Sequence, residues 1–402
     1  MDIIIVILII LVFARLFSGL FARMGQPRII GELIAGFIIG PSILNLVSPD
    51  VEGLEMIAGL GVYFLVLFAG MQMSMSRMKE YYRPALFIAF LGNNIAILSG
   101  IVVGKIYSLD LISSFFIGVV FSLTALPVGV RILIDMGKLD TPTGKIIVMS
   151  ALLDDIFSVF LFALVLFIAE SNSEMPEAGF IFIIVAKIVL FLLIIFIFNK
   201  LLTIREGFLE KHIISAVGKL AKESQFFYIL VFGILMGYIG GMLGITFIIG
   251  IFYAGTLIKA TTVGKQAFSH MEAVTSSVTF GIFSPLFFAY MGLLMNISSI
   301  FDYTNPFSVQ NLFQVTFFIT LLFFATVGKS IGAFIGGLLA NMKLRDAAAV
   351  GIALNARGLM GLVILEIGYK NGLIEQNVYA MLVIMCLITT FLTPSILKKV
   401  LK

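Results

Sequence analysis

Long apolar stretches alternate with short polar or charged breaks along almost the whole chain. Each stretch approaches the roughly 20 apolar residues that an α-helix needs to cross a bilayer. The pattern therefore predicts an all-α polytopic membrane protein with about thirteen transmembrane helices. The predicted segments are residues 2–20, 28–46, 54–74, 84–107, 113–136, 145–170, 178–203, 224–241, 243–262, 275–296, 311–341, 345–368 and 376–397.

The fifth and the twelfth of these segments are interrupted by residues that weaken a helix. The interrupting residues are Ser122, Thr124 and Pro127 in the fifth segment and Asn355, Arg357 and Gly358 in the twelfth. Interrupted helices free backbone carbonyls and half-helix ends, which can hold ions inside a membrane. We therefore expect a mid-membrane site where the two interrupted helices meet.

The positions of the two interruptions indicate an internal symmetry. If the seventh segment is a connector, six segments lie on each side of it, and each interruption falls in the fifth segment of its half. Equivalent segments are then seven apart and inverted in the membrane. The chain is thus predicted to be a single transporter unit, residues 1–402. Residues 1–170 form the first inverted repeat, 171–223 a linker helix and cytoplasmic connector, and 224–402 the second repeat.

Two acids and two bases lie deep inside apolar runs: Asp154 and Asp155 in the sixth segment, Lys329 in the eleventh and Arg357 at the break of the twelfth. A charge near mid-bilayer costs roughly 2.5–3.5 kcal/mol or more, so such residues are normally paired or line a wet cavity. Adjacent helical residues diverge by about 100°, so one carboxylate can pair with Lys329 while the other faces a cavity. The cavity-facing carboxylate would bind either a proton or a hard cation, with oxygens from Ser122 and Thr124 assisting.

Other polar residues in apolar runs have structural interpretations. Lys329 paired with a carboxylate could serve only to hold two helices together. Arg357 stays charged at any accessible pH and is expected to neutralise half-helix carbonyls at its break. Glu32, near the cytoplasmic end of the second segment, is expected to face water in a funnel.

Composition and charge agree with a membrane protein. Of the 402 residues, 60% are hydrophobic and 12% are charged, which is too apolar for a soluble domain. The net charge of +4 carries no nucleic-acid signal, because the basic residues are scattered through short loops. Lys and Arg are concentrated in alternate loops, and loops rich in these residues lie on the cytoplasmic side of a cell membrane. This bias predicts that the N-terminus lies outside the cell and the C-terminus in the cytoplasm.

Several motifs, in this order and spacing, resemble those of a known family. They are GELIAGFIIGP, FLVLFAGMQM, SALLDD, SPLFFAYMGLLMNI and NARGLMG. Together with the interrupted fifth segment and the lysine of the eleventh, they cover essentially the whole chain. The chain thus resembles the monovalent cation:proton antiporter-2 family of bacterial sodium/proton and potassium/proton exchangers. This resemblance implies a core domain with two crossed, broken helices, a dimerisation domain, and elevator-like movement of one against the other.

The resemblance also implies roles for individual residues. Asp155 looks like the ion-binding carboxylate, Asp154 like the partner of Lys329, and Ser122 and Thr124 like the family's polar positions at the first break. The transported sodium would then be bound by Asp155 and Thr124. An Asp-Asp pair with a lysine is similar to electrogenic sodium/proton members, whereas potassium-selective members often carry Gln-Asp. Unequal exchange is driven also by the membrane potential, by about 2.3 kcal/mol per charge per 100 mV.

The sequence thus predicts a secondary antiporter that exchanges sodium, or lithium, for protons and acts as a homodimer in pH homeostasis. No cofactor is expected. Two alternatives stay open: a potassium/proton antiporter of the same fold, and a sodium-coupled organic-anion symporter. An intramembrane aspartyl protease is disfavoured, because its two carboxylates must converge on one water and helical neighbours cannot do so. We therefore do not expect an enzyme.

Overall fold

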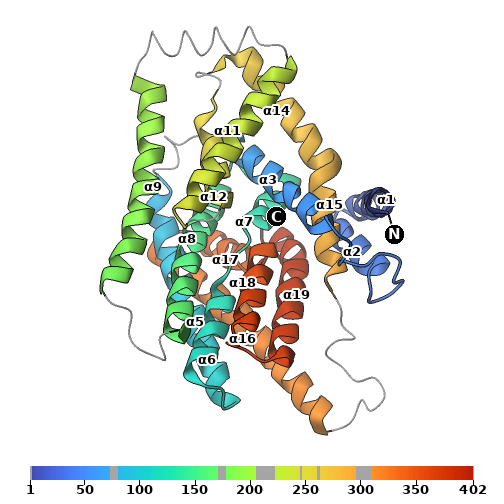
Figure 1. Ribbon diagram of the computed structural model, residues 1–402, viewed down its shortest axis with the longest axis vertical. Coiled ribbons are helices and arrows are strands. Elements are labelled where there is room, and N and C mark those ends of the chain that lie inside the picture. Colours follow the sequence, from blue (N-terminus) through green and yellow to red (C-terminus); the bar gives the residue numbers. More distant parts are fainter. Residues whose placement is uncertain are drawn as a thin grey trace. The chain divides into compact units, whose positions relative to one another are not determined.

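The computed structural model describes residues 2–72, 80–170, 178–204, 222–244, 247–259, 263–295 and 309–401, and all regular structure in these ranges is helical (Figure 1). Eight helices in the described ranges are long and apolar enough to cross a membrane. The helices are α1 (Ile3–Arg23), α2 (Arg28–Ile39), α3 (Leu54–Gln72), α5 (Tyr82–Ile106), α6 (Leu111–Ser122), α7 (Leu126–Asp135), α8 (Pro142–Glu170), α9 (Ala178–Ile204), α11 (Lys222–Met242), α12 (Phe247–Leu257), α14 (Lys265–Val278), α15 (Ser284–Leu293), α16 (Val309–Leu339), α17 (Leu344–Ala353), α18 (Leu359–Lys370) and α19 (Gln376–Leu401).

The predicted all-helical class is confirmed, whereas the number of thirteen spans stays a prediction. The predicted boundary between the eighth segment (224–241) and the ninth (243–262) agrees with the structure, because α11 ends at Met242 and Gly244 has a positive φ of 74° in the following turn. The tenth segment was predicted to begin at residue 275, but helix α14 already begins at Lys265. Its first turns are polar, and apolar periodicity alone does not find such an extension.

Both predicted helix interruptions are present. Helix α6 ends at Ser122 and α7 begins at Leu126, with Leu123 and Ala125 in extended conformation. Pro127 lies in the first turn of α7, where its missing N–H would have had no helical partner, so it helps to start the second half-helix. The second interruption separates α17 from α18, which begins after Gly358.

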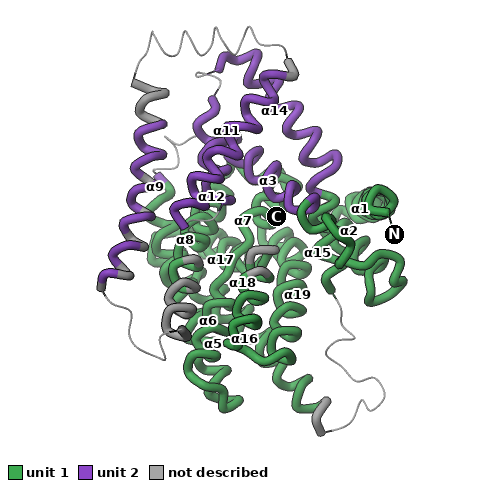
Figure 2. Tube along the Cα trace, viewed as in Figure 1, with its two compact units in different colours: residues 1–56, 81–175, 285–402 green, residues 57–80, 176–284 purple. Residues whose placement is uncertain are grey.

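The chain divides into two compact units (Figure 2). Unit 1 comprises residues 1–56, 81–175 and 285–402, and unit 2 comprises residues 57–80 and 176–284. Unit 1 takes helices from both halves of the sequence, including both interrupted helices and the segments with Asp154 and Lys329. The inverted repeats 1–170 and 224–402, with the connector 171–223, stay a prediction.

Within unit 1, helices α5 and α16 approach each other closely. A Cβ on Gly332 would lie 2.6 Å from the carbonyl oxygen of Leu91, and a Cβ on Gly336 would lie 2.6 Å from the Cα of Ile88. Larger side chains at these two positions would force the helices apart, as expected for membrane helices packed through small residues. This close packing brings the α16 position at Lys329 next to α5.

Within unit 2, helix α11 packs against α12 and α14. Gly250 of α12 faces the backbone of α11, since a Cβ there would lie 2.2 Å from the carbonyl oxygen of Met236. The hydroxyl of Tyr63 donates a hydrogen bond of 2.6 Å to the carbonyl of Leu230. Buried tyrosine hydroxyls normally find such a partner.

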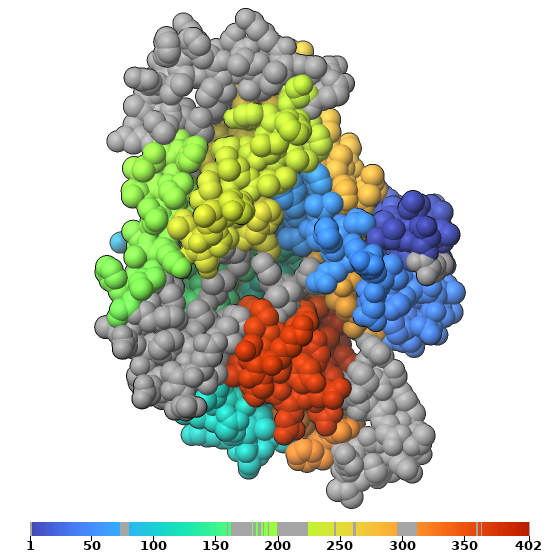
Figure 3. Space-filling view, in the orientation of Figure 1, coloured from blue at the N-terminus to red at the C-terminus, as the bar shows by residue number. Residues whose placement is uncertain are grey.

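Large apolar side chains cover the exposed faces of several helices. On α1, Ile4, Leu8 and Leu16 are exposed, and side chains of this helix (dark blue) are visible at the surface in Figure 3. Phe227 and Tyr238 of α11 are exposed as well. Such apolar faces suit contact with lipid rather than water.

Candidate functional site

The two helix interruptions of unit 1 touch each other. The N–H of Ala125 donates a hydrogen bond of 2.7 Å to the carbonyl of Ala356. A Cβ on Gly358 would lie 2.7 Å from the Cβ of Ala125, so the crossing leaves no room for a side chain there. The fold thus places two non-helical stretches of backbone in contact within a helical core, where freed carbonyls are available.

Lys329 lies fully buried beside this crossing and is bound by three acceptors. Its Nζ donates hydrogen bonds of 2.7 Å each to Oδ2 of Asp154, to Oδ1 of Asn93 and to the carbonyl of Ser122. A lysine ammonium has three N–H donors, so this environment matches its charged form. Four separate helical segments, namely α5, α6, α8 and α16, supply these groups.

Asp154 is fully buried and uses one of its two oxygens. Its Oδ2 accepts from Lys329, and the hydroxyl oxygen of Thr124 lies 2.8 Å from the same atom. The Thr124 oxygen is also 2.9 Å from the carbonyl of Leu354, and its single proton can serve only one of these acceptors at a time. Oδ1 of Asp154 has no hydrogen-bond partner among the residues that the structure describes.

Asp155, the neighbour of this buried pair, is in a different environment. Its side chain is only partly buried, and within the described parts of the chain no hydrogen bond or ion pair engages it. The structure therefore gives the two carboxylates different environments, as the helical angle predicts: one is bound to Lys329 and the other is partly exposed. The Thr124 hydroxyl contacts Asp154, and the binding of sodium by Asp155 and Thr124 stays a prediction.

The remaining predicted residues stabilise the crossing. The Ser122 hydroxyl donates to Val119 in its own helix, so Ser122 reaches Lys329 through its backbone carbonyl. The Asn355 side chain donates a hydrogen bond of 2.9 Å to the carbonyl of Thr326. These contacts tie the broken ends to the neighbouring helices.

Arg357 is fully buried and donates to backbone carbonyls. Its Nη2 lies 2.8 Å from the carbonyl of Phe121, in the last turn of α6, and 3.0 Å from that of Ala325. Its Nη1 lies 3.2 Å from the carbonyl of Asn355 and from the hydroxyl of Thr389. Within the described ranges no carboxylate pairs with it. A cation placed at the carboxyl end of a half-helix offsets its partial negative charge.

Two features of the site were not found from the sequence. Asn93 was missed, although an Asn-Asn pair inside the apolar segment 84–107 was a visible signal.

The expectation that Glu32 faces a wet funnel is wrong: Glu32 is fully buried and accepts a 2.9 Å hydrogen bond from Arg131. Arg131 also lies 3.4 Å from Asp135. The partner of Glu32 is about one hundred residues away in the chain, so local pattern could not reveal it.

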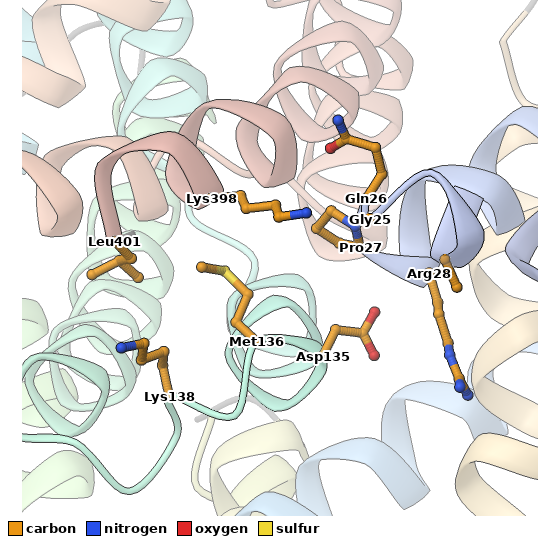
Figure 4. Close-up of a pocket in the computed structure, with 10 residues that line it drawn as sticks. Gly25, Gln26, Pro27, Arg28, Asp135, Met136, Lys138, Lys398 and Leu401 are labelled. Carbon is orange, nitrogen blue, oxygen red and sulfur yellow. The ribbon is translucent and has the colours of Figure 1, made fainter.

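A separate cavity of about 490 Å³ lies at the ends of α1, α7 and α19, within unit 1 (Figure 4). Lys398 extends across it towards Gly25 and Pro27, with Asp135 and Arg28 to one side. None of the predicted ion-site residues lines it. Basic residues at these helix ends are what the charge bias of cytoplasmic loops predicts.

Comparisons with known proteins agree with this geometry. The family model described as "Sodium/hydrogen exchanger, transmembrane" matches residues 7–402. The chain belongs to the sodium/hydrogen exchanger family. The predicted membership of a monovalent cation:proton antiporter family is thereby confirmed, and the family is one of transporters in membranes.

Several relatives match over nearly their whole length. A Na(+)/H(+) antiporter of Enterococcus hirae is 27% identical over 99% of this chain and 98% of its own. The Na(+)/H(+)-K(+) antiporter GerN of Bacillus cereus is 29% identical over 98% and 94%. The Na(+)/H(+) antiporter NhaS4 of Synechocystis is 30% identical over 98% and 96%.

A solved structure confirms the fold. The sodium proton antiporter MjNhaP1 from Methanocaldococcus jannaschii superposes with a TM-score of 0.66 at 16% sequence identity. The match covers 98% of this exchanger-family chain and 95% of that structure. The predicted sodium/proton antiporter fold is therefore confirmed, while the roles of individual residues stay predictions.

Proposed function

We propose that the chain exchanges sodium, or lithium, for protons across the membrane, with Asp155 as the carboxylate for which the two ions compete. The observation that carries this proposal is the contrast between the two neighbouring carboxylates. Asp154 is held by Lys329 at 2.7 Å, whereas Asp155 is partly exposed and has no partner among the described residues. Membership of the sodium/hydrogen exchanger family supports the same reaction.

The chemistry follows from the properties of a carboxylate. An ionised carboxylate binds a hard cation such as sodium through oxygen, and a protonated one does not. A sodium ion on Asp155 and a proton on Asp155 are therefore alternative states of one group, and the Thr124 oxygen, which contacts the neighbouring Asp154, would assist the sodium ion. If the protein reorients only when Asp155 is occupied, uptake of one ion is coupled to release of the other.

The buried pair supports an electrogenic exchange. Lys329 has three acceptors and is charged in this arrangement. If sodium binding displaces Lys329 from Asp154 and the freed ammonium releases its proton, one sodium ion is exchanged for two protons, one from Asp155 and one from Lys329. Exchange of more protons than sodium ions would then respond to membrane potential, by about 2.3 kcal/mol per net charge per 100 mV.

A potassium/proton antiporter of the same fold is the second candidate, because one relative is named a Na(+)/H(+)-K(+) antiporter. We further propose a cell-membrane location with the N-terminus outside and the C-terminus in the cytoplasm, a homodimer, and elevator-like movement in pH homeostasis. No resident cofactor is needed by this mechanism. The charge bias of the loops supports the orientation.

The proposal is tested by reconstituting the purified protein in liposomes that contain a pH-sensitive dye. Sodium or lithium added to the wild type should drive proton movement, and the Asp155→Asn variant should abolish it. Asp140→Asn is the matched control, because its carboxylate side chain is 73% exposed outside this site. If only potassium drives proton movement, the transported ion is potassium rather than sodium. Sodium-driven proton movement that survives in Asp155→Asn would contradict the role of Asp155 as the ion-binding carboxylate.

A further inference from the structure

We propose that Asn93 is a positioning residue that holds Lys329 so that one oxygen of Asp154 stays available to the transported ions. This inference rests on the proposed function and adds a residue of α5 to its machinery. Asn93 is buried, and its Oδ1 accepts one of the three hydrogen bonds of Lys329 at 2.7 Å.

The argument begins with the hydrogen bonds of the ammonium group. Asn93, the Ser122 carbonyl and Oδ2 of Asp154 together take all three N–H donors of Lys329. Lys329 therefore needs only one oxygen of Asp154. The other oxygen, Oδ1, is buried and unpartnered among the described residues.

Loss of the Asn93 acceptor would change this balance. A buried N–H without an acceptor is unfavourable, so the ammonium would seek a new one. Oδ1 of Asp154 belongs to the carboxylate that Lys329 already binds, and it is negatively charged. Lys329 would then engage both carboxylate oxygens, and a hydrogen bond between two ionised groups is stronger than one to a neutral amide oxygen.

The consequence concerns affinity rather than turnover. An ion that approaches Asp154 and Asp155 would meet a carboxylate that is fully occupied by Lys329. Sodium would have to compete against a tighter ion pair, so its apparent affinity would fall. The steps that reorient the protein would be affected less.

The neighbouring residue offers a matched control. Asn94 follows Asn93 in α5 and is exposed, and its side chain donates a hydrogen bond of 2.7 Å to the carbonyl of Phe90 in its own helix. Asn93→Leu and Asn94→Leu thus make the same chemical change on one helix turn. Only the first of them removes an acceptor of Lys329.

The experiment measures the KM for sodium in proteoliposomes and the Kd for sodium by calorimetry on the purified protein. Asn93→Leu should raise both about tenfold, the size expected when one hydrogen bond to a charged group is redistributed, with little change in maximal rate. Asn94→Leu should keep the wild-type values. Asn93→Gln, which retains a neutral amide acceptor, should keep the KM closer to the wild-type value than Asn93→Leu does.

Equal KM values in Asn93→Leu and Asn94→Leu would overturn the proposal. If Asn93→Leu does not fold, Asn93→Gln and Asn93→Ala decide: a KM that is raised equally in both variants would contradict a role of the amide oxygen as acceptor. Measurements on the wild type test the proposed function independently of this inference. If the wild type shows neither sodium-driven proton flux nor sodium binding, the proposed function itself is wrong. With both present, the variants test Asn93 alone.

Discussion

The buried pair of Asp154 and Lys329 makes a quantitative prediction about stability. Both side chains are 0% exposed and their charged atoms lie 2.7 Å apart. Asp154→Asn keeps the shape but removes the negative charge, which leaves a buried ammonium without a counter-charge. Breaking a buried ion pair in this way costs about 3–5 kcal/mol.

An independent limit supports this magnitude. Lys329 can escape the uncompensated charge by releasing its proton, which costs roughly 4–5 kcal/mol at pH 7 for an ordinary lysine. The loss should therefore not exceed that value by much. With the unfolding entropy per residue of globular proteins, a loss of about 4 kcal/mol in 402 residues lowers the melting temperature by roughly 4–6 °C.

The assay is thermal unfolding of the detergent-purified protein at neutral pH, for Asp154→Asn, Lys329→Met and the double variant. Because the double variant removes both charges, it should be more stable than the sum of the single losses implies. Glu366→Gln is a control, since its pair with Lys370 is 2.6 Å long but exposed, and exposed pairs contribute little. A loss of stability in the double variant that equals the sum of the two single losses would refute a coupled ion pair.

Two further predictions concern the other charged groups. Glu32→Gln should reduce stability by about 1–3 kcal/mol. This loss is smaller than that of Asp154→Asn, because Arg131 keeps Asp135 as a second carboxylate at 3.4 Å. Thermal unfolding checks this prediction, and a loss equal to that of Asp154→Asn would show that Asp135 does not compensate. Burial raises the pKa of Asp110, but hydrogen bonds from the hydroxyl and N–H of Ser113 lower it more, so that the pKa lies below its ordinary value. The charged cap of α6 therefore stabilises the fold above about pH 4 and loses this effect as pH falls through the lowered pKa. Asp110→Ala should lose about 0.5–2 kcal/mol at pH 6, and unfolding midpoints measured down to pH 3 should converge with those of the wild type.

Several residues of the candidate site could be predicted from the sequence because they are charged or helix-breaking residues within apolar segments. Asp154, Asp155 and Lys329 stand out in apolar runs, where a charge needs a partner or a wet cavity. The angle between helical neighbours then requires different environments for the two carboxylates, and the structure has this arrangement. Pro127 marked an interruption because proline is accepted in a first helical turn.

Partners that are far apart in the chain could not be predicted in the same way. Asn93 lies 236 residues from Lys329, and Glu32 lies 99 residues from Arg131. A single polar residue on a helix indicates that it needs a partner but carries no information about which neighbour supplies it. That choice depends on how the helices pack.

The helical class, the interrupted helices and the ionisable residues of the site thus follow from the sequence, because length, apolarity and helix-breaking residues act locally. Only the tertiary structure decided that the Ser122 carbonyl rather than its hydroxyl binds Lys329, and that Asn93 completes the set of acceptors. It also decided that Glu32 is buried in an ion pair. These outcomes depend on the distance and orientation of packed helices, which are set by close contacts such as that of Gly332 with the backbone of α5.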